Sequence, residues 1–258
     1  RGLGDVYKRQ VIQWQWKEDV FPECDQFNGI HEGLVQSWKD IFPKKGEIHF
    51  AGALENNEDT GTLQYLASTA MEAGFSTRVL DMQALDLQNG RFFDPAGELV
   101  NRCFKLYPWE WMVDESPDGC LAEMEWLEPI WKLVMSNKAI LATLYELFPD
   151  SPYVLPCYLS RPRSGLFCKK PVFSREGHNV SVVDIRDWEE YVRIAETEGD
   201  YNTGAYVYQE YAEPTAYSGR YPVIGSWIIG GEAAGIGIRE NRMEVTDNLS
   251  EFVPHIIG

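Results

Sequence analysis

A strand–helix–strand pattern near the amino end of the chain constrains its fold most strongly. Residues 46–54 read GEIHFAGAL, a short apolar run that is typical of a buried strand. In residues 58–74 apolar side chains recur at helical spacing, and Gly74 ends the run. Residues 76–82, STRVLDM, predict the next strand. Because two strands joined through a helix usually run in the same direction, the pattern predicts a parallel βαβ unit.

From residue 151 onward the pattern changes to short strands. A tight turn at Gly230-Gly231 is expected to join the last two strands, and one helix is expected near residues 187–198. The expected strands are residues 166–172, 178–184, 204–211, 222–229 and 233–239. A βαβ unit followed by antiparallel strands and helices predicts an α+β (mixed α/β) fold.

The domain limits are predicted from composition. Asp, Ser, Pro and Gly cluster in residues 113–122, so we expect a βαβ-containing subdomain over 11–112 and a second region over 113–258. Residues 1–10, RGLGDVYKRQ, are polar and begin without Met, and we expect them to be a non-native leader.

The acidic composition bears on the class of partner. The chain of 258 residues has a formal net charge of −17 and an isoelectric point of about 4.6. Nucleic-acid binding needs clustered Lys and Arg, which no long stretch supplies, so a nucleic-acid partner is not expected. An acidic surface suits a cationic partner such as a polyamine, although it also serves solubility alone.

Five widely spaced cysteines and the hydropathy pattern indicate the compartment. No C-x-x-C occurs, so neither a disulfide framework nor a cysteine metal site is expected. Buried thiols fit a reducing compartment, and we expect a cytoplasmic protein. No apolar run reaches the roughly 20 residues of a membrane span, so no membrane partner is expected.

The first candidate residues for phosphate binding are lysines. Lys138 stands at the start of an expected helix in SNKAIL, where an ammonium and backbone N–H groups can meet an anion. Lys170 and Lys169 lie on opposite faces of the expected strand 166–172. A lysine on an apolar face is costly unless an anion meets it, but the spacing does not decide which lysine points inward. An exposed lysine pair is the alternative.

The polar loop after that strand is a second candidate. Residues 173–177 supply a hydroxyl, a guanidinium, a carboxylate and a glycine, which can fold over a polyphosphate. A solvated hairpin is the alternative. Residues 209–211, Gln-Glu-Tyr, end another expected strand and can offer backbone groups to a base edge, or simply be an exposed strand end. Arg239 can stabilise charge on a transferring phosphoryl group, or form an ion pair with Glu240.

Several common sites are excluded by the absence of their motifs. The chain has no G-x-G-x-x-G, no Walker A motif and no H-E-x-x-H, so neither a Rossmann nucleotide site nor a zinc protease site is supported. It also has no G-x-S-x-G nucleophile elbow.

Several long segments, taken together, resemble the glutathionylspermidine synthase family. They cover most of residues 11–258 in the expected order: QWQWKEDVFP, DQFNGIHEGLVQSW, FKLYPWEWM, EPIWKLVMSNKAIL, KKPVFSREGHNV, VIGSWIIGGEAAGIGIRE and VTDNLSEFVPH. More narrowly, the chain is similar to stand-alone synthetase-like members without an amidase domain. The resemblance implies an ATP-grasp fold in which 113–258 is the nucleotide-binding region and the βαβ subdomain precedes it.

What the resemblance implies about activity is amide formation. Family members phosphorylate a carboxylate with ATP, and an amine attacks the resulting acyl phosphate; in the type enzyme the acid is glutathione and the amine is spermidine. ATP and Mg²⁺ are therefore the expected cofactors, and a peptide carboxylate and a polyamine the expected small-molecule partners. The alternative is a nucleotide- or polyamine-binding protein without ligase activity.

The resemblance also assigns roles to residues of this chain. Arg239 would lie near the reacting phosphate, and Glu58 and Asp59 would meet the cationic amine. Trp109 and Glu110 would line the substrate cleft. The residues that would bind ATP are Lys138, Lys170, Ser174, Arg175, Glu176, Gly177, His178, Asn179, Gln209, Glu210, Tyr211 and Ala212.

One part of the family pattern is missing. The family's metal ligands lie in an R-x-D and E-x-N segment that would end just before residue 11, where RGLGDVYKRQ stands instead. The match ENN at 55–57 lacks the surrounding motif and is interpreted as chance. The resemblance therefore implies a C-terminal fragment with no metal ligands of its own.

Overall fold

The computed structural model describes residues 11–175, 177–187, 191–201, 204–242 and 250–258. The expected leader, residues 1–10, lies outside the described residues. The chain divides into two compact units. The first unit comprises residues 1–131, 224–238 and 252–258, and the second comprises residues 132–223 and 239–251. Each unit is described on its own.

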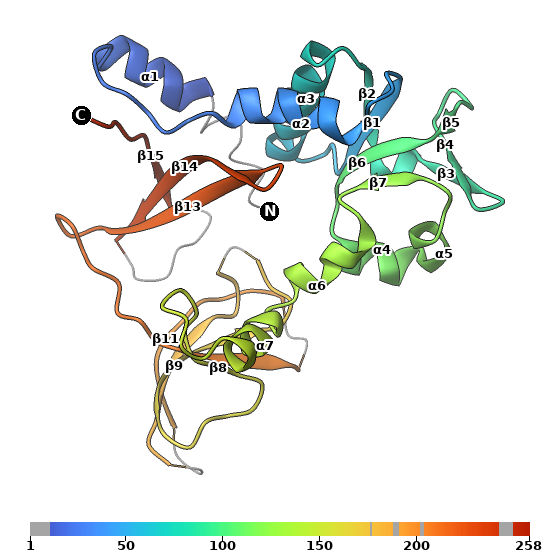
Figure 1. Ribbon diagram of the computed structural model, residues 1–258. Helices are drawn as coiled ribbons and strands as arrows, with labels where there is room; N and C mark the ends of the chain where they lie inside the picture. The colour runs from blue at the N-terminus through green and yellow to red at the C-terminus, as the bar shows by residue number, and fades with distance from the viewer. Residues whose placement is uncertain (1–10, 176, 188–190, 202–203, 243–249) are drawn as a thin grey trace. The chain divides into compact units, whose positions relative to one another are not determined.

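A four-stranded parallel sheet forms the centre of the first unit (Figure 1). Its strand order is β2-β1-β6-β7, and every neighbouring pair is parallel. The bounds are β1 Glu47–Gly52, β2 Ser76–Asp81, β6 Arg102–Leu106 and β7 Glu125–Leu127. The predicted βαβ unit is confirmed, because α3 (Asn57–Glu72) connects β1 to its parallel neighbour β2.

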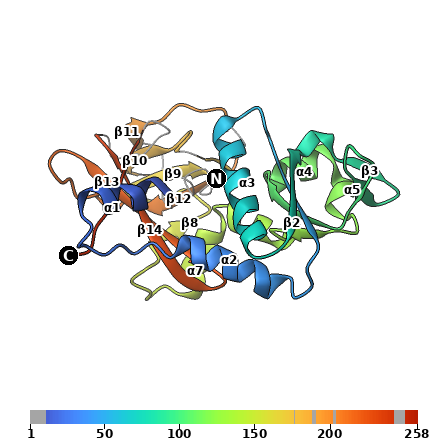
Figure 2. The same cartoon turned by 90° about the horizontal axis from the view of Figure 1, so that it is seen from above.

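Two helices cover one face of this sheet. Phe50 and Phe104 are register partners on that face, and their rings lie 5.7 Å apart. They pack against Trp38 of α2 (Ile30–Ile41) and against the apolar side of α3, which runs along β2 (Figure 2). The Trp38 indole N–H donates to Thr69 Oγ1 at 2.9 Å, so α2 and α3 are joined by a buried hydrogen bond as well as by apolar contact.

The position of α3 is set at its amino end. The Asn56 side chain accepts a hydrogen bond from the Glu58 N–H at 2.9 Å, which satisfies one of the otherwise unpaired donors of the first turn. Because β1 ends at Gly52, this capped end of α3 lies at the carboxyl edge of the sheet.

Smaller elements complete the first unit. A three-stranded antiparallel sheet follows β2, with the order β3-β4-β5. These elements are α1 Gln13–Val20, η3 Met82–Ala84, β3 Asp86–Gln88, β4 Arg91–Phe93, β5 Leu99–Val100, α4 Trp109–Glu115 and α5 Pro117–Cys120.

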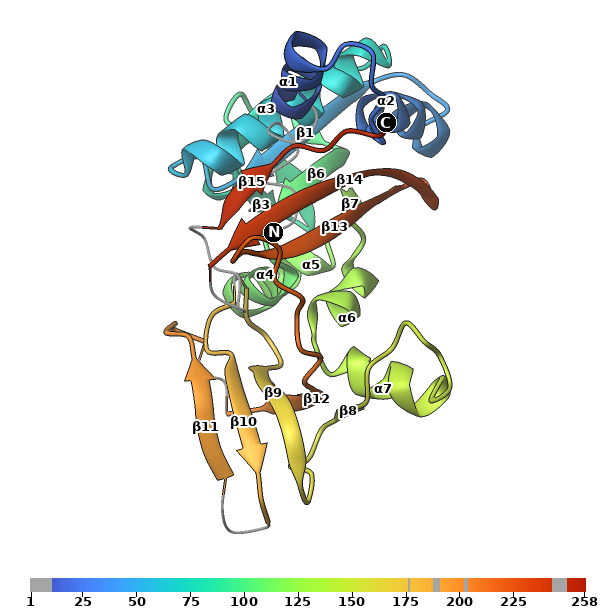
Figure 3. The ribbon, with the colours of Figure 1, turned by 90° about the vertical axis from the view of Figure 1, so that its left-hand side faces the viewer.

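The second unit is built on a five-stranded sheet with the order β11-β10-β9-β12-β8 (Figure 3). All its neighbouring strands are antiparallel. The strands are β8 Cys157–Tyr158, β9 Gly165–Pro171, β10 Ser181–Ile185, β11 Tyr191–Glu196 and β12 Tyr206–Glu210. The helices α6 Leu133–Ser136 and α7 Ile140–Leu147 precede it in the chain, and η4 Ile130–Lys132 spans the limit between the two units. Ala142 of α7 packs on Val207 and Cys157, so α7 covers one face of the sheet.

A third sheet has the order β13-β14-β15, with β13 Tyr221–Ile229, β14 Glu232–Asn241 and β15 Glu251–Val253. Gly230 and Gly231 connect β13 to β14 and have φ values of 61° and 90°. Two successive positive φ values are what a two-residue hairpin turn requires, and glycine adopts them without strain. The predicted turn is confirmed.

The mixed α/β fold class is confirmed, but one predicted element is wrong. Residues 191–196 of the expected helix 187–198 form β11, which pairs with β10 at Ile185–Tyr191 and Val183–Arg193. Residues 188–190 lie outside the described residues. Pairing with β10 outweighs the local helical pattern, and Tyr, Val and Ile at three of these positions favour a strand. Within the described ranges, no helix is long and apolar enough to cross a bilayer.

A buried polar cluster connects distant parts of the first unit. The Phe27 N–H donates to His255 Nε2 at 3.2 Å, so this nitrogen carries no proton. Nδ1 then carries the proton and donates to Gln13 Oε1 at 3.0 Å. Burial lowers the pKa of His255 below its ordinary value of 6.5, and burial likewise lowers the pKa of His49.

We expect stability to fall in mild acid. Both imidazoles have a lower pKa in the folded chain, so the unfolded chain binds more protons below pH 6.5. Each can contribute a slope of at most about 1.4 kcal/mol per pH unit. The free energy of unfolding, measured in urea between pH 7.5 and 5.5, should therefore decrease as pH falls. His255→Gln should flatten this dependence, whereas an unchanged slope in the variant would contradict the assignment.

Candidate functional site

Lys169 and Lys170 of β9 point to opposite faces of the five-stranded sheet. Lys170 pairs in register with Val207, which packs under α7, so Lys170 shares the face covered by that helix. The Lys169 ammonium lies 3.9 Å from the centre of the Tyr206 ring. Tyr206 alternates with Val207 along β12 and so belongs to the other face. The structure therefore answers the question that the spacing left open.

Lys170 is held by a residue from the next strand. Its ammonium donates to Gln209 Oε1 at 2.7 Å, which brings two of the predicted ATP-binding residues together. Gln209 is also the register partner of Cys157 on β8. Burial raises the pKa of the Cys157 thiol, and the nearby Lys170 charge opposes this only in part. The thiol is thus neutral at pH 7, and Lys170 provides the positive charge at this position.

Lys138 contacts the predicted phosphate loop. Its ammonium donates to the Ser174 carbonyl at 2.5 Å and to Ser174 Oγ at 2.9 Å. The Lys138 backbone N–H donates to the Val172 carbonyl at 2.8 Å, so the segment before α7 is fixed to the end of β9 at two points. The structure thus unites Lys138 and Ser174, which lie 36 residues apart.

The later part of the loop is fixed by the segment after β11. Thr197 donates through Oγ1 to the Gly177 carbonyl. Asn179, which has a φ of 55°, accepts the Tyr201 N–H on Oδ1 at 2.8 Å. His178 lies with its ring centre 5.9 Å from that of Tyr201. Glu176, also predicted to bind ATP, lies outside the described residues.

The predicted hinge follows the end of β12. The Glu210 N–H donates to the Pro156 carbonyl at 2.8 Å, and the Tyr211 N–H donates to the Leu166 carbonyl at 3.0 Å. Both donors are therefore used in holding β12 between its neighbours. Ala212 is exposed and lies just beyond the strand.

Arg239 lies in β14, a strand of a different sheet from Lys170. Burial lowers the pKa of its guanidinium from the ordinary value of 12.5, and the group stays charged at pH 7. The predicted alternative partner, Glu240, lies 4.0 Å from Arg220 instead.

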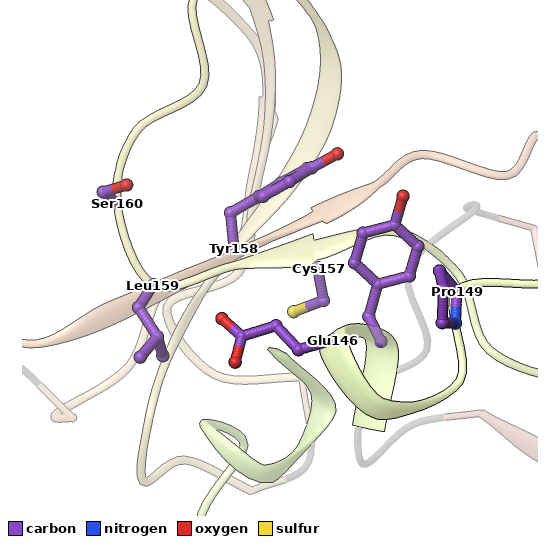
Figure 4. Close-up of a pocket in the computed structure, with 7 residues that line it drawn as sticks. Glu146, Pro149, Cys157, Tyr158, Leu159 and Ser160 are labelled. Atoms are coloured by element: carbon purple, nitrogen blue, oxygen red, sulfur yellow. The ribbon is translucent and has the colours of Figure 1, made fainter. Parts of the chain in front are cut away.

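A cavity of about 320 Å³ lies between the end of α7 and β8 (Figure 4). It is lined by Tyr145, Glu146, Pro149, Cys157, Tyr158, Leu159 and Ser160. The rings of Tyr145 and Tyr158 are 5.7 Å apart in an edge-on arrangement. The cavity adjoins the predicted hinge, because Cys157 is the register partner of Gln209. Its volume is at the lower end of the roughly 300–1,000 Å³ of small-molecule pockets.

The first unit has a topological switch point at the carboxyl edge of its parallel sheet. The chain leaves β1 through α3 toward β2, whereas β6 lies on the opposite side of β1. In open parallel sheets, ligands bind in the crevice outside the carboxyl ends of the strands at such a point. By this rule we expect a crevice between the segment that follows β1 and the segment that follows β6.

All four predicted substrate residues come from these two segments. Glu58 and Asp59 lie in the first turn of α3, where Glu58 is exposed and Asp59 is 8% exposed. Trp109 and Glu110 begin α4 directly after β6. Trp109 is only 5% exposed and its indole N–H donates to the Glu128 carbonyl at 3.1 Å. Both segments leave the carboxyl edge of the sheet, although they lie about fifty positions apart in sequence.

The described residues were also compared with the requirements of a metal site. Among the described residues, no group of three or more His, Cys, Asp or Glu side chains is arranged to hold a metal ion. Sequence reasoning missed Thr197, which fixes the loop, and Lys105, which is buried beside Trp109. A lysine inside the apolar stretch RCFKLYPW was the available signal for Lys105.

A solved structure and a protein-family model both match this chain. The crystal structure of a putative gamma-glutamylcysteine synthetase from Methylobacillus flagellatus KT matches with a TM-score of 0.56 at 9% identity, over 98% of this chain and 86% of that one. At that identity the likeness shows a shared mixed α/β fold alone. The family model for the glutathionylspermidine synthase preATP-grasp region matches residues 5–258.

Three curated relatives are similar over nearly the whole chain. A putative acid–amine ligase of Haemophilus influenzae is 35% identical over an alignment of 259 positions that covers 95% of this chain. Trypanothione synthetase of Crithidia fasciculata is 27% identical over 93% of the chain. The bifunctional glutathionylspermidine synthetase/amidase of Escherichia coli is 26% identical over 96% of the chain.

The chain belongs to the glutathionylspermidine synthase family, as the sequence motifs predicted. It spans 66% of the length of the Haemophilus influenzae relative. It spans 41% and 44% of the other two relatives.

Proposed function

We propose that this chain provides the nucleotide-binding region and part of the substrate cleft of an ATP-dependent carboxylate–amine ligase. The observation that supports this most is the arrangement of Lys170 and Gln209 on one face of β9 and β12, with Lys138 bonded to the loop that follows β9. Two cations and a polar loop from separate segments thus converge within the second unit. The relatives that join acids to amines point to the same chemistry.

The proposed reaction has two steps. A carboxylate oxygen attacks the γ-phosphorus of ATP, the bond to the β-phosphate oxygen breaks, and ADP leaves with that electron pair. The neutral amine then attacks the carbonyl carbon of the acyl phosphate, and phosphate leaves as the amide forms and the nitrogen loses a proton. By analogy with the relatives' names, a peptide such as glutathione would be the acid and a polyamine such as spermidine the amine.

In this proposal the second unit binds the nucleotide. Lys138 and Lys170 offset the negative charge of the phosphates, and the loop Ser174–Asn179 covers them. Arg239 stabilises charge on the phosphoryl group as it moves. These roles rest on the family resemblance together with the contacts of Lys138 and Lys170.

The adenine would meet the strand end at residues 209–212. Because the Glu210 and Tyr211 N–H groups already donate to Pro156 and Leu166, the base edge would need another donor. The Ala212 N–H, two residues beyond the end of β12, is the group we assign to it. Gln209 would act indirectly, by orienting Lys170.

When bound, Mg²⁺ would offset the negative charge of the ATP phosphates. The described residues include no set of side chains arranged to hold it, so no step above uses a metal ligand from this chain. The substrate cleft is placed at the carboxyl edge of the parallel sheet, where Glu58 and Asp59 would attract the cationic amine.

The domain limits and the cellular location belong to the same proposal. Residues 11–112 would form the βαβ-containing subdomain and 113–258 the ATP-grasp nucleotide-binding region. The five cysteines are free thiols, which fits a reducing cytoplasm.

The direct test of ligation is ADP release. It is measured for this chain and for the Haemophilus influenzae relative, with glutathione and spermidine added singly and together. Release that needs both an acid and an amine is expected for a ligase. ATP binding without any acceptor-dependent release would instead indicate a nucleotide-binding protein.

The two adjacent lysines give a matched comparison. Lys170→Ala should weaken ATP binding by tenfold or more, because a charge-assisted contact to phosphate typically contributes about 1.5–3 kcal/mol. Lys169→Ala removes a lysine from the opposite face and should change the ATP dissociation constant less than threefold. Calorimetric titration measures both. Equal losses of affinity would contradict the assignment of Lys170.

A further inference from the structure

A buried lysine lies near the carboxyl end of β6, at the edge of the sheet where the substrate crevice is proposed. Lys105 is the penultimate residue of β6 and is only 7% exposed. It shares a sheet face with Cys103, away from the Phe50–Phe104 core on the other face. Burial of an ammonium is costly, so its contacts must offset a large loss of hydration.

The contacts of Lys105 are directed at the turn between β6 and α4. Its ammonium donates to the Tyr107 carbonyl at 2.7 Å and lies 3.8 Å from the centre of the Trp109 ring. A cation over an indole ring is the most favourable cation–π pair, and it is strongest when the pair is desolvated. One side chain thus fixes two residues of a three-residue turn, Tyr107 through its backbone and Trp109 through its ring.

The Trp109 ring is restrained on its other sides as well. Its N–H donates to the Glu128 carbonyl, and its ring packs edge-on to Trp126 at 5.6 Å. Trp109 is therefore an anchor of the first turn of α4. The position of the next residue, Glu110, depends on how this anchor is held.

The thiols near Lys105 do not change its charge. Burial raises the pKa of Cys103 to about 12 and also raises the pKa of Cys120, with the Lys105 charge opposing both shifts. Both thiols stay protonated at pH 7 and give the ammonium no negative counter-charge.

We propose that Lys105 is a positioning residue of the substrate crevice. It does not touch the ligand; it fixes the Tyr107–Trp109 turn so that Glu110 and the Tyr107 side chain face the crevice in one arrangement. The inference rests on the proposed function, because it takes this crevice as the place where acid or amine substrate binds. Fixed positions of the binding groups are important, because small displacements of these groups reduce affinity and rate steeply.

The same turn carries a second polar pair that this positioning would control. The Tyr107 hydroxyl donates to Glu115 Oε2 at 2.5 Å. Burial, followed by the bond to Glu115, raises the pKa of Tyr107 to about 12, so the hydroxyl remains a donor throughout the neutral range. The Trp111 ring lies 5.5 Å from the Tyr107 ring.

The chain offers a matched control at the other edge of the same sheet. Lys45 lies 4.3 Å above the Phe75 ring and donates to the Ala73 carbonyl. It precedes β1, so it lies at the amino edge, where no crevice is expected. Lys45→Met removes the same two kinds of contact without affecting the β6–α4 turn.

The test compares Lys105→Met, Lys105→Arg and Lys45→Met with the unchanged chain. The first readout is the indole N–H resonance of Trp109, assigned with Trp109→Phe. The second is the dissociation constants of glutathione, spermidine and ATP. We expect Lys105→Met to shift the Trp109 signal and to weaken at least one of the two substrate probes by tenfold or more. ATP affinity should stay within twofold, and Lys105→Arg should restore most of the loss.

The possible results distinguish the positioning role of Lys105 from the existence of the substrate crevice. An unmoved Trp109 signal, or substrate affinities equal to those of Lys45→Met, would overturn the positioning role. If the unchanged chain binds neither glutathione nor spermidine, the proposed substrate crevice is contradicted. This outcome is distinct from loss of the positioning role, because it is seen without any substitution. If Lys105→Met does not fold, Lys105→Gln keeps an N–H donor but removes the charge, and the same outcomes apply.

Discussion

The alternation of side chains along β9 decides which of two adjacent lysines lies on the face covered by α7. Lys169 and Lys170 have the same charge and are neighbours in sequence, yet the strand sends one toward Tyr206 and the other toward Gln209. A shift of register by a single residue would exchange them. Pairing of β9 with both β10 and β12 prevents such a shift, so the proposed phosphate site depends on the sheet that surrounds it.

The first unit depends on a comparable constraint, the parallel direction of its strands. Because β1 and β6 are parallel neighbours, the segments that lead into α3 and α4 leave the sheet at the same edge, although they are far apart in sequence. The proposed substrate crevice would use acidic residues of α3 and the turn before α4 that Lys105 holds.

Local patterns predicted much of the fold. The βαβ unit and the Gly230-Gly231 turn were visible because both depend on residues close in sequence. The helix predicted at 187–198 was wrong because pairing of β11 with β10 is a long-range effect. For the site, family motifs named Lys138 and Lys170, but their contacts with Ser174 and Gln209 join segments more than thirty residues apart. Spacing alone could not show those contacts, nor the inward face of Lys170.

The most direct measurement is acetylation of lysines with and without ATP, followed by mass spectrometry of the peptides. Bound ATP should protect Lys138 and Lys170, whose ammonium groups lie on the loop and on the α7 face of the sheet. Lys169, on the opposite face, should react equally in both conditions. Protection of Lys170 without protection of Lys169 is the predicted result. Equal protection of the two, or none at Lys138 and Lys170 at saturating ATP, would contradict a nucleotide site here.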